Sequence, residues 1–316
     1  MKLDFSNINV LVVGDFMLDS FILGSSNRIS PEAPVPVVLT KEKKIVLGGA
    51  GNVINNLYSL GCNIFPFGVV GNDSAGKMII DMLNSINVDT SGIISDSEHT
   101  STKKERIFID GKQVLRLDEE VKIDINKYQK SIEDYCISII ENVDIIIISD
   151  YNKGVVSKKI VEFLIRKAKD NNIKVIIDPK KLDFSDYRNA NIITPNISEL
   201  ERAANKKIND DYELELACKA LIKENNFEFI LVTKSEKGMS LIGYDNIFHI
   251  DPIFVENPDV SGAGDTVVAT LASCLALGMN ANESAEISNI SASIVVAKHG
   301  TSTISLDDLK NNINRR

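Results

Sequence analysis

The sequence predicts an α/β fold: a doubly wound, mostly parallel sheet with helices on both faces, plus a small additional β-sheet. Short runs of β-branched residues alternate with longer segments of helical period, which is the pattern of βαβ units. Some runs, such as Ile145 to Ile148, are apolar throughout, as is typical of central strands covered on both faces. Because 316 residues with 44% apolar content can bury a large core, we expect one domain over residues 1–316.

The expected elements follow from these two periods. The β-branched runs predict strands at residues 10–13, 64–70, 143–148, 175–177, 192–194 and 230–233. Apolar residues three or four apart predict helical faces, which are Val53, Leu57 and Leu60; Met78, Met82, Leu83 and Ile86; Ile132, Cys136, Ile139 and Ile140; Val156, Ile160, Phe163 and Leu164; and Val267, Leu271 and Cys274.

Residues 16–47 and 93–121 interrupt this alternation. The first segment carries three prolines among β-forming residues, and the second has Asp110-Gly111 between two β-forming runs, which predicts a hairpin turn. Neither segment can bury a face alone. We therefore expect them to form one small sheet that acts as a lid over the ligand edge of the large sheet, or that packs against the lid of a second subunit in a homodimer.

The charge and the cysteines narrow the class of protein. Thirty-five basic and 44 acidic residues give a net charge of −9, so the chain has no basic field for nucleic acid or a membrane surface. The cysteines are scattered through apolar patterns without a metal-binding spacing, which predicts buried thiols in a reducing compartment. The short apolar stretch near the N-terminus is too brief for a signal peptide or membrane helix, so we expect a cytoplasmic protein.

Polar residues follow five of the expected strands. In an open α/β sheet, ligands bind beyond the carboxyl ends of the strands, so these residues predict a site for hydroxyls, phosphates and a cation. They are Gly14-Asp15, residues 149–153, residues 178–180, residues 194–199 and Thr233-Lys234. Lys153 and Lys180 favour a substrate that already carries a phosphate. The lid segments carry three arginines that could also contact this phosphate, namely Arg28, Arg106 and Arg116. For each of them, a solvent-exposed charge is at least as good an explanation as a phosphate contact.

Residues 259–266 place small residues directly before an apolar helical pattern. The first turn of a helix offers unpaired N–H groups, and Gly262 and Gly264 would let a phosphate approach the main chain. Asp265 in the same turn could act as the base for an attacking hydroxyl. The alternative is a tight loop into a helix, with Asp265 as an ordinary first-turn acid.

Two further motifs have a functional and a structural interpretation. Gly48-Gly49-Ala50-Gly51-Asn52 lacks the dinucleotide pattern G-x-G-x-x-G, which disfavours a nicotinamide oxidoreductase. It would suit a sugar bound by main chain and by the Asn52 amide, or a plain glycine loop that caps a helix. Asn196 and Glu199 lie three residues apart and could hold Mg²⁺ directly or through water, or form a helix cap with a first-turn acid.

On these residues the chain resembles the ribokinase-like (pfkB-type) family of carbohydrate kinases. Gly48 to Asn52 resembles the family's N-terminal glycine motif, Asp259 to Asp265 resembles its C-terminal signature, and the match covers nearly the whole chain. The resemblance implies transfer of a phosphoryl group from ATP, with Mg²⁺, to a sugar hydroxyl. It makes Asp265 the base, while Gly262, Ala263 and Gly264 would offer N–H groups to the phosphoryl group.

The same resemblance implies the remaining roles. Asn196 and Glu199 would serve Mg-ATP, and the nucleotide site would be lined by Thr233, Lys234 and Gly238. The sugar would be held by Asp15, Gly48, Gly49 and Asn52. Asp259 and Ser261 fall where relatives bind a monovalent cation such as K⁺, although the sequence itself does not demand that ion.

A narrower resemblance is to the kinases of this family that phosphorylate C1 of D-glycero-β-D-manno-heptose 7-phosphate, on the path to ADP-heptose and lipopolysaccharide. It rests on residues 14–19, 28–37, 149–151 with 153–154, and Lys298 with 300–303. Such kinases are often fused to a nucleotidyltransferase domain, which we expect on another polypeptide or a removed segment because this chain stops at Arg316. The alternatives are a kinase for another sugar or sugar phosphate and a non-catalytic sugar or nucleotide sensor.

Overall fold

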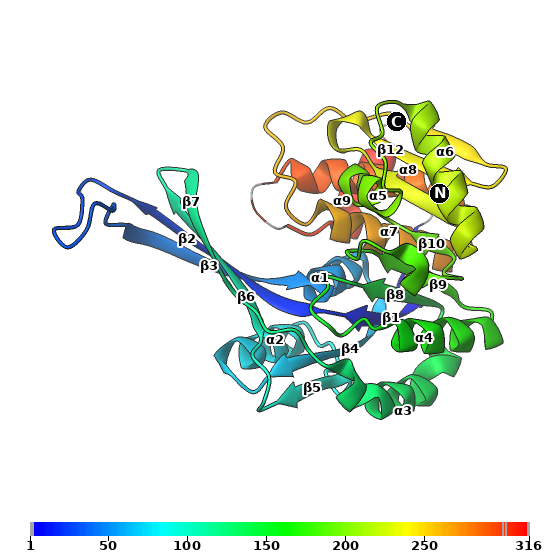
Figure 1. Ribbon diagram of the computed structural model, residues 1–316, viewed down its shortest axis with the longest axis horizontal. Coiled ribbons are helices and arrows are strands. Elements are labelled where there is room, and N and C mark those ends of the chain that lie inside the picture. The colour runs from blue at the N-terminus through cyan, green and yellow to red at the C-terminus, as the bar shows by residue number, and fades with distance from the viewer. Residues whose placement is uncertain (1–2, 299, 301, 315–316) are drawn as a thin grey trace.

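A nine-stranded sheet forms the centre of the computed structural model, which describes residues 3–298, 300 and 302–314 (Figure 1). The strand order is β13-β12-β11-β10-β9-β8-β1-β4-β5, and only β12 pairs antiparallel with its neighbours. The strands are β1 (Asn9–Gly14), β4 (Asn63–Gly71), β5 (Ile93–Asp96), β8 (Ile145–Ser149), β9 (Lys174–Asp178), β10 (Ile192–Ile193), β11 (Phe229–Thr233), β12 (Met239–Gly243) and β13 (Ile247–Ile250).

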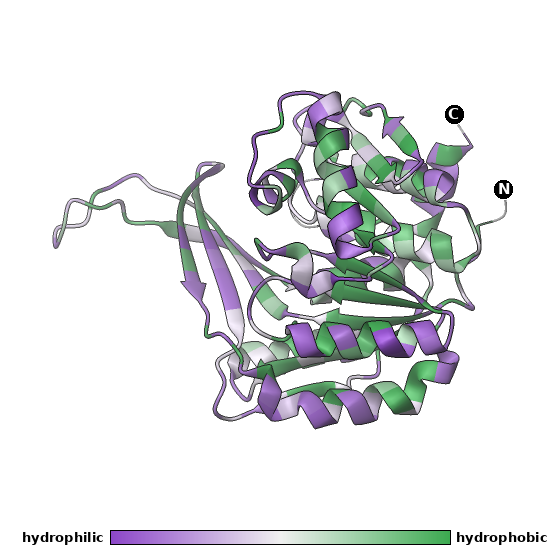
Figure 2. Cartoon of the chain, turned by 45° about the vertical axis from the view of Figure 1, so that its right-hand side comes forward, coloured by the Kyte–Doolittle hydropathy of each residue, from purple (hydrophilic) through white to green (hydrophobic). Residues whose placement is uncertain are grey.

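Helices cover both faces of this sheet, which confirms the predicted fold class. The α-helices are α1 (Ala50–Leu60), α2 (Ser74–Ser85), α3 (Gln129–Ile139), α4 (Lys158–Asp170), α5 (Ile197–Ala203), α6 (Asp211–Asn225), α7 (Ala263–Ala276), α8 (Ala281–Val296) and α9 (Leu306–Ile313). The 3-10 helices are η1 (Ile125–Tyr128), η2 (Ile140–Asn142), η3 (Phe184–Tyr187) and η4 (Ser235–Lys237). Figure 2 shows apolar strands between helices whose outer sides are hydrophilic.

Alternation along the strands divides the core into two parts. In β1, Val10 and Val12 pack with α1, α2, α7, α8 and α9, while Leu11 and Val13 pack with α3, α4, α5 and α6. This is expected when successive side chains point to opposite faces of a fully covered sheet. The four cysteines are buried and free, as expected of core thiols.

Two expected elements differ in detail. Of the face predicted for α2, Leu83 is buried and Met82 and Ile86 pack against the core, whereas Met78 is 36% exposed; Ala75 and Ile79 complete the buried stripe. The strand expected at residues 192–194 is limited to Ile192–Ile193. No helix in the described part of the chain combines the length and the apolar character needed to cross a membrane.

The segments that interrupt the βα alternation form a second sheet, here called the lid sheet. It consists of β2 (Phe16–Ser25), β3 (Leu39–Gly49), β6 (Thr102–Ile109) and β7 (Lys112–Glu119), in the order β3-β2-β6-β7. The predicted hairpin turn joins β6 to β7, and Asp110 and Gly111 have φ values of 46° and 82°. One part of the expectation is wrong, because Ile93–Asp96 pairs with β4 in the large sheet.

The lid sheet projects from the body of the molecule, and its far end is the β2–β3 connection (Figure 1). Its near end joins the body at Asp15, the single residue between the end of β1 at Gly14 and the start of β2 at Phe16. The lid sheet therefore begins at the carboxyl edge of the large sheet, where ligands bind in α/β folds.

Candidate active site

Asp265 lies in the first turn of α7, at the carboxyl edge of the large sheet. It is 4% exposed and accepts hydrogen bonds from Asn52 Nδ2 at 2.7 Å and the Tyr151 hydroxyl at 3.0 Å. Burial raises its pKa to about 6, although the two hydrogen bonds act in the opposite direction. A carboxylate with a pKa near 6 is ionised at neutral pH and is still basic enough for general-base catalysis.

Glycine occurs at positions 262 and 264, before Asp265, for different structural reasons. Gly262 caps α7 with φ of 79°, a conformation that glycine adopts far more readily than other residues. A side-chain carbon at Gly264 would meet no atom within 4 Å, so protein packing does not require glycine there. The open space lies beside the helix N-terminus, where N–H groups attract anions. The Ala263 N–H donates to the Val260 carbonyl at 3.2 Å.

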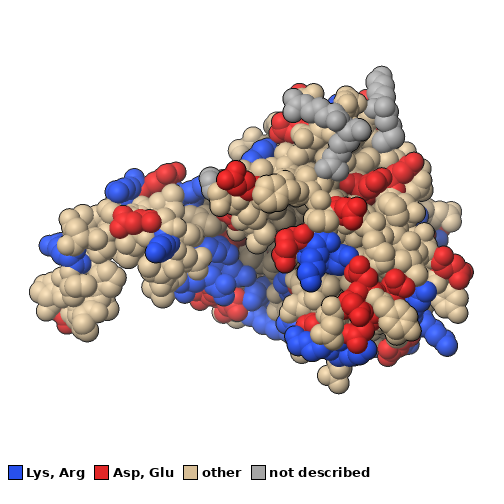
Figure 3. Space-filling view, turned by 90° about the horizontal axis from the view of Figure 1, so that it is seen from above, with Lys and Arg blue, Asp and Glu red and all other residues tan. Residues whose placement is uncertain are grey.

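A cavity of about 140 Å³ opens beside Asp265, between α1, α7 and the lid sheet. Figure 3 shows a hollow between the projecting sheet and the body, with Lys and Arg side chains beside it. The residues that line the cavity are Met17, Asp19, Phe21, Gly49, Asn52, Lys104, Arg106, Tyr151, Ser261, Gly262 and Asp265. The two glycine motifs, which are far apart in the sequence, therefore meet at one cavity.

The first glycine motif allows α1 to start close to β2. Gly49 caps α1 with φ of 57°, and a side-chain carbon there would lie 2.4 Å from the Asp15 carbonyl oxygen. At Gly48 it would lie 2.3 Å from Asp19 Oδ2. Both the capping role and the close approach of main chain to the cavity thus apply, and Asn52 on α1 reaches Asp265.

Asp15, which the resemblance assigned to the sugar, is not among the cavity residues. It is 1% exposed, and its carboxylate accepts the backbone N–H groups of Tyr151, Lys153 and Val155 at 2.9, 2.9 and 3.0 Å. Burial, together with the negative charge of Asp150, raises its pKa to about 6. The geometry of Asp15 supports a role in holding the 151–155 loop, and Asp19 occupies the cavity position instead.

The cations at the cavity also differ from those expected. Lys153 pairs with Glu120 and Lys180 with Glu199, each at 2.5 Å, and neither lysine lines the cavity. Lys104 does, and burial with Lys153 nearby lowers its pKa.

Of the three lid arginines, one reaches the cavity. Arg106 lines it and bonds Asp19 Oδ1 at 2.6 Å. Arg28 is exposed, and Arg116 is exposed and pairs with Asp118 on its own strand. The solvent-exposed alternative therefore fits Arg28 and Arg116 but not Arg106.

Sequence reasoning missed Asp19 and Lys104 as cavity residues, left Arg106 open between a phosphate contact and a solvent-exposed charge, and gave Tyr151 no role of its own within residues 149–153. A period of two along the strands could have found the first three, because Met17, Asp19 and Phe21 alternate on β2, and Lys104 and Arg106 alternate on β6. Tyr151 lies in a loop, so the strand period does not apply to it, and its only indication was its place directly after β8.

Asn196 and Glu199 form a helix cap, the structural alternative for this pair. Asn196 Oδ1 accepts the Glu199 N–H, and Glu199 Oε2 accepts the Asn196 N–H, both at 2.9 Å, at the start of α5. The other Glu199 oxygen bonds Lys180. Among the described residues, no group of three or more His, Cys, Asp or Glu side chains could hold a metal ion.

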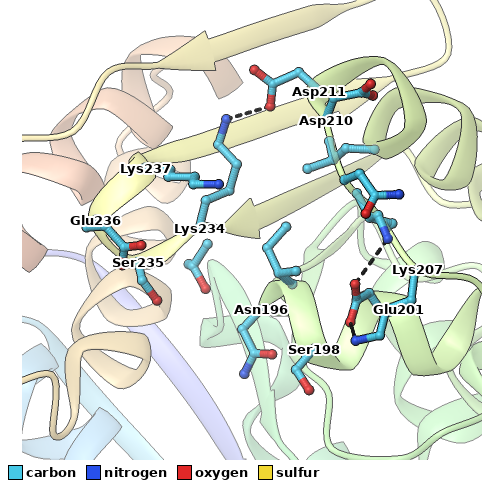
Figure 4. A pocket seen from close by; sticks show the side chains of 15 residues that line it. Asn196, Ser198, Glu201, Lys207, Asp210, Asp211, Lys234, Ser235, Glu236 and Lys237 are labelled. Atoms are coloured by element: carbon cyan, nitrogen blue, oxygen red, sulfur yellow. Dashed lines mark hydrogen bonds and ion pairs between the residues drawn. The ribbon is translucent and has the colours of Figure 1, made fainter.

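Two adjacent pockets share Thr233, Ser235 and Glu236, and one of them reaches Val260 in the loop before α7. One, of about 620 Å³, lies between α5, α6 and the loop after β11. In Figure 4, Lys234 reaches across this pocket to Asp211, 3.0 Å away. The other, of about 450 Å³, is lined mainly by apolar residues from segment 252–260 and α8, and by Gly238. The predicted nucleotide residues Thr233, Lys234 and Gly238 thus gather at these pockets.

Asp259 joins the loop before α7 to the segment after α8. Its oxygens accept the N–H groups of Ser261 at 3.0 Å and Gly300 at 2.8 Å. Ser261 also lines the cavity beside Asp265. Of the residues used for the narrower resemblance, Thr301 lies outside the described part of the chain.

Comparison with known proteins agrees with this architecture. The pfkB family carbohydrate kinase model matches residues 7–309. The bifunctional protein HldE of Helicobacter acinonychis is 40% identical over 95% of this chain and 65% of its own length. HldE of Geobacter sulfurreducens is 39% identical over 94% of this chain and 61% of its own length. The chain therefore spans less than two thirds of these relatives.

Solved structures share the fold at low sequence identity. Phosphofructokinase-2 from Escherichia coli in complex with potassium matches with a TM-score of 0.81 and 19% identity, covering 98% of each chain. Arabidopsis thaliana ribokinase complexed with ribose and ATP has a TM-score of 0.76 and 18% identity, covering 97% of this chain and 98% of the other. These likenesses show a ribokinase-like fold with a smaller separate sheet.

Proposed function

Because the chain belongs to the pfkB family of carbohydrate kinases, we propose that it transfers the γ-phosphoryl group of ATP to the C1 hydroxyl of D-glycero-β-D-manno-heptose 7-phosphate. Family membership makes it a phosphotransferase with an alcohol group as acceptor. Similarity to HldE proteins over about 95% of the chain supports a heptose kinase role. The product would be the 1,7-bisphosphate, for ADP-heptose and lipopolysaccharide core synthesis.

One observation carries the choice of a phosphorylated substrate. The cavity that holds the buried carboxylate of Asp265 also holds two cationic side chains, Lys104 and Arg106. Arg106 pairs with Asp19 in the same cavity, so the two cations offset the two acids there, and in a chain with a net charge of −9 they are the groups that could hold an anionic ligand. A sugar with its phosphate on these cations would present another hydroxyl to Asp265.

The protein's part in the reaction is alignment and charge neutralisation. Asp265 would accept the proton of the attacking hydroxyl, and Asn52 keeps one of its oxygens in place at 2.7 Å. Gly262, Ala263 and Gly264 would direct main-chain N–H groups to the phosphoryl group, for which the Ala263 N–H would have to leave Val260. The lid sheet would cover the cavity and exclude water.

The nucleotide would occupy the two adjacent pockets, with its phosphates directed toward the first turn of α7. Thr233, Lys234 and Gly238 line these pockets. Mg²⁺ would neutralise the phosphates, and it suits a site with few protein ligands because it keeps several waters. Asn196 and Glu199 would reach it through water, since their side chains already form the helix cap and the bond to Lys180.

We also propose a monovalent-cation site and a homodimer. Asp259 and Ser261 would lie near a K⁺ site, and the Escherichia coli phosphofructokinase-2 structure contains potassium. A homodimer would form through the lid sheet, which exposes apolar side chains, namely Ile29, Leu39, Val114, Leu115 and Leu117. A cytoplasmic location stays a prediction.

The direct test is ADP release with Mg-ATP across a panel of heptose, hexose and pentose phosphates. We expect the highest kcat/KM with the heptose 7-phosphate, and a new anomeric phosphate signal in the ³¹P NMR spectrum of the product. Faster turnover of another sugar would select the alternative kinase. Binding of sugar and nucleotide without ADP release would select the non-catalytic sensor.

Gly264→Ala tests phosphoryl docking at this turn separately from the stability of α7. Alanine is the better helix former by about 0.5–1 kcal/mol, and its methyl group would enter open space, so we expect an unchanged or higher melting temperature. The same methyl group would obstruct the phosphoryl group, and we expect kcat to fall about tenfold. Thermal melting and steady-state kinetics on one preparation check both effects, and normal kcat would exclude phosphoryl docking at this turn.

A further inference from the structure

Tyr151 contacts the candidate base and two lysines at once. Its hydroxyl donates to Asp265 Oδ1 at 3.0 Å. The ammonium groups of Lys104 and Lys180 lie over its ring, 5.9 and 5.4 Å from the centroid. Lys104 belongs to the lid sheet and Lys180 follows β9 of the large sheet, so Tyr151 joins the two sheets at the cavity.

The loop that carries Tyr151 is fixed from the side of the large sheet. The carboxylate of Asp15 accepts three of its backbone N–H groups within 3.0 Å. Since a carboxylate with both oxygens bonded to main chain has little freedom to reorient, the start of the loop has a defined position.

The loop is also tied to the lid. The segment that follows β7 lies against it, and the Ile123 N–H donates to the Lys153 carbonyl at 2.8 Å. Lys153 Nζ pairs with Glu120 at 2.5 Å. Gly154 has φ of 113°, and a side-chain carbon there would lie 2.2 Å from the Ile123 carbonyl oxygen. A movement of β7 would therefore be transmitted to residues 151–155.

We propose that Tyr151 is a positioning residue for Asp265, and that its loop makes the placement of this carboxylate depend on the position of the lid sheet. The proposal rests on the proposed kinase function for its catalytic meaning. With both oxygens of Asp265 bonded, by Asn52 and by Tyr151, the carboxylate keeps one orientation toward the cavity. A displaced lid would withdraw the Tyr151 hydroxyl and leave the base held by Asn52 alone.

The hydrogen bond from Tyr151 also affects the pKa of Asp265. It stabilises the ionised carboxylate, so its loss raises the pKa of Asp265 above the value of about 6. The other groups that act on this carboxylate are Asn52, which donates to it, the cation Lys180, and the anions Asp19 and Asp178. Tyr151→Phe leaves these groups in place and removes only the hydroxyl.

The test is Tyr151→Phe with two readouts. The pKa of Asp265, followed by ¹³C NMR of the side-chain carboxyl and assigned with Asp265→Asn, is expected to rise by about 0.5–1 unit. The acid limb of the kcat/KM profile should move to higher pH by the same amount, and kcat should fall about tenfold while KM for the sugar changes little. Tyr187→Phe is the matched control, because it removes a 2.7 Å hydrogen bond to Asp150 and leaves Asp265 alone.

An unchanged Asp265 pKa in Tyr151→Phe, or an equal shift in Tyr187→Phe, would overturn the proposal. The NMR titration needs no substrate, so it decides this point even if the wild-type chain phosphorylates none of the sugars. A wild-type chain that phosphorylates none of the sugars would instead count against the proposed function.

Dependence on the lid is tested by Glu120→Gln, which breaks the ion pair with Lys153. We expect it to lower kcat about threefold in the wild type and to have no effect in the Tyr151→Phe background, because both changes act through one contact. Glu119→Gln, which removes an exposed pair with Lys103, is the control. Additive effects of the two substitutions would refute the link between lid and base.

Discussion

Asp265→Asn is expected to reduce turnover by at least ~10²-fold while leaving ATP binding largely intact. The amide cannot accept the proton of the attacking hydroxyl, whereas the two pockets proposed for the nucleotide do not include this residue. In the wild type, kcat/KM should fall below pH 6 as the carboxylate, with its pKa of about 6, becomes protonated. In the variant this acid limb should disappear.

Steady-state kinetics and a nucleotide-binding titration check this prediction. Asp144→Asn is the control, because Asp144 is exposed and lies before β8, at the opposite edge of the large sheet. Near-normal turnover in Asp265→Asn would remove this carboxylate from the mechanism.

Arg106→Gln is expected to lower kcat/KM for the sugar phosphate by about 10²-fold, mainly through KM. The guanidinium lines the cavity, and its loss removes a charge-assisted contact to the substrate phosphate and leaves Asp19 without its 2.6 Å partner. For the sugar without phosphate, the loss should be much smaller.

The comparison of phosphorylated with unphosphorylated sugar makes the test specific. Arg116→Gln is matched to it, since Arg116 is another lid arginine but is exposed and pairs with Asp118 on its own strand. Equal losses with both sugars would show that Arg106 supports the lid sheet and does not recognise phosphate.

The fold could be predicted because its strands carry a local pattern. Continuous apolar runs such as Ile145 to Ile148 occur in strands buried on both faces, and the structure places them there. β5 falls within segment 93–121, which was expected in the lid because it interrupts the βα alternation, and its pairing with β4 is decided by tertiary packing that sequence does not show.

The site could be predicted at the two glycine motifs and the first turn of α7, where local main-chain geometry guides the choice of residues. Gly49 and Gly262 have φ values of 57° and 79°, so their glycines mark the cavity directly. The lysines expected at the cavity were not identified correctly in this way. Lys153 and Lys180 follow strands at the carboxyl edge of the sheet, but they pair with Glu120 and Glu199. Asp15 has the residue type of a sugar ligand, yet backbone N–H groups occupy its carboxylate. These partners come from distant segments and become visible only in three dimensions.

The central claim is that a nucleotide phosphoryl group docks at the first turn of α7, next to Asp265 and a sugar hydroxyl. A crystal structure of the chain with a non-hydrolysable ATP analogue, Mg²⁺ and the heptose 7-phosphate tests it most directly. We predict the terminal phosphate against the N–H groups of Gly262 to Gly264, the C1 hydroxyl within hydrogen-bond distance of Asp265, and the 7-phosphate on Lys104 and Arg106. A terminal phosphate bound away from this turn, or a C1 hydroxyl remote from Asp265, would contradict the account.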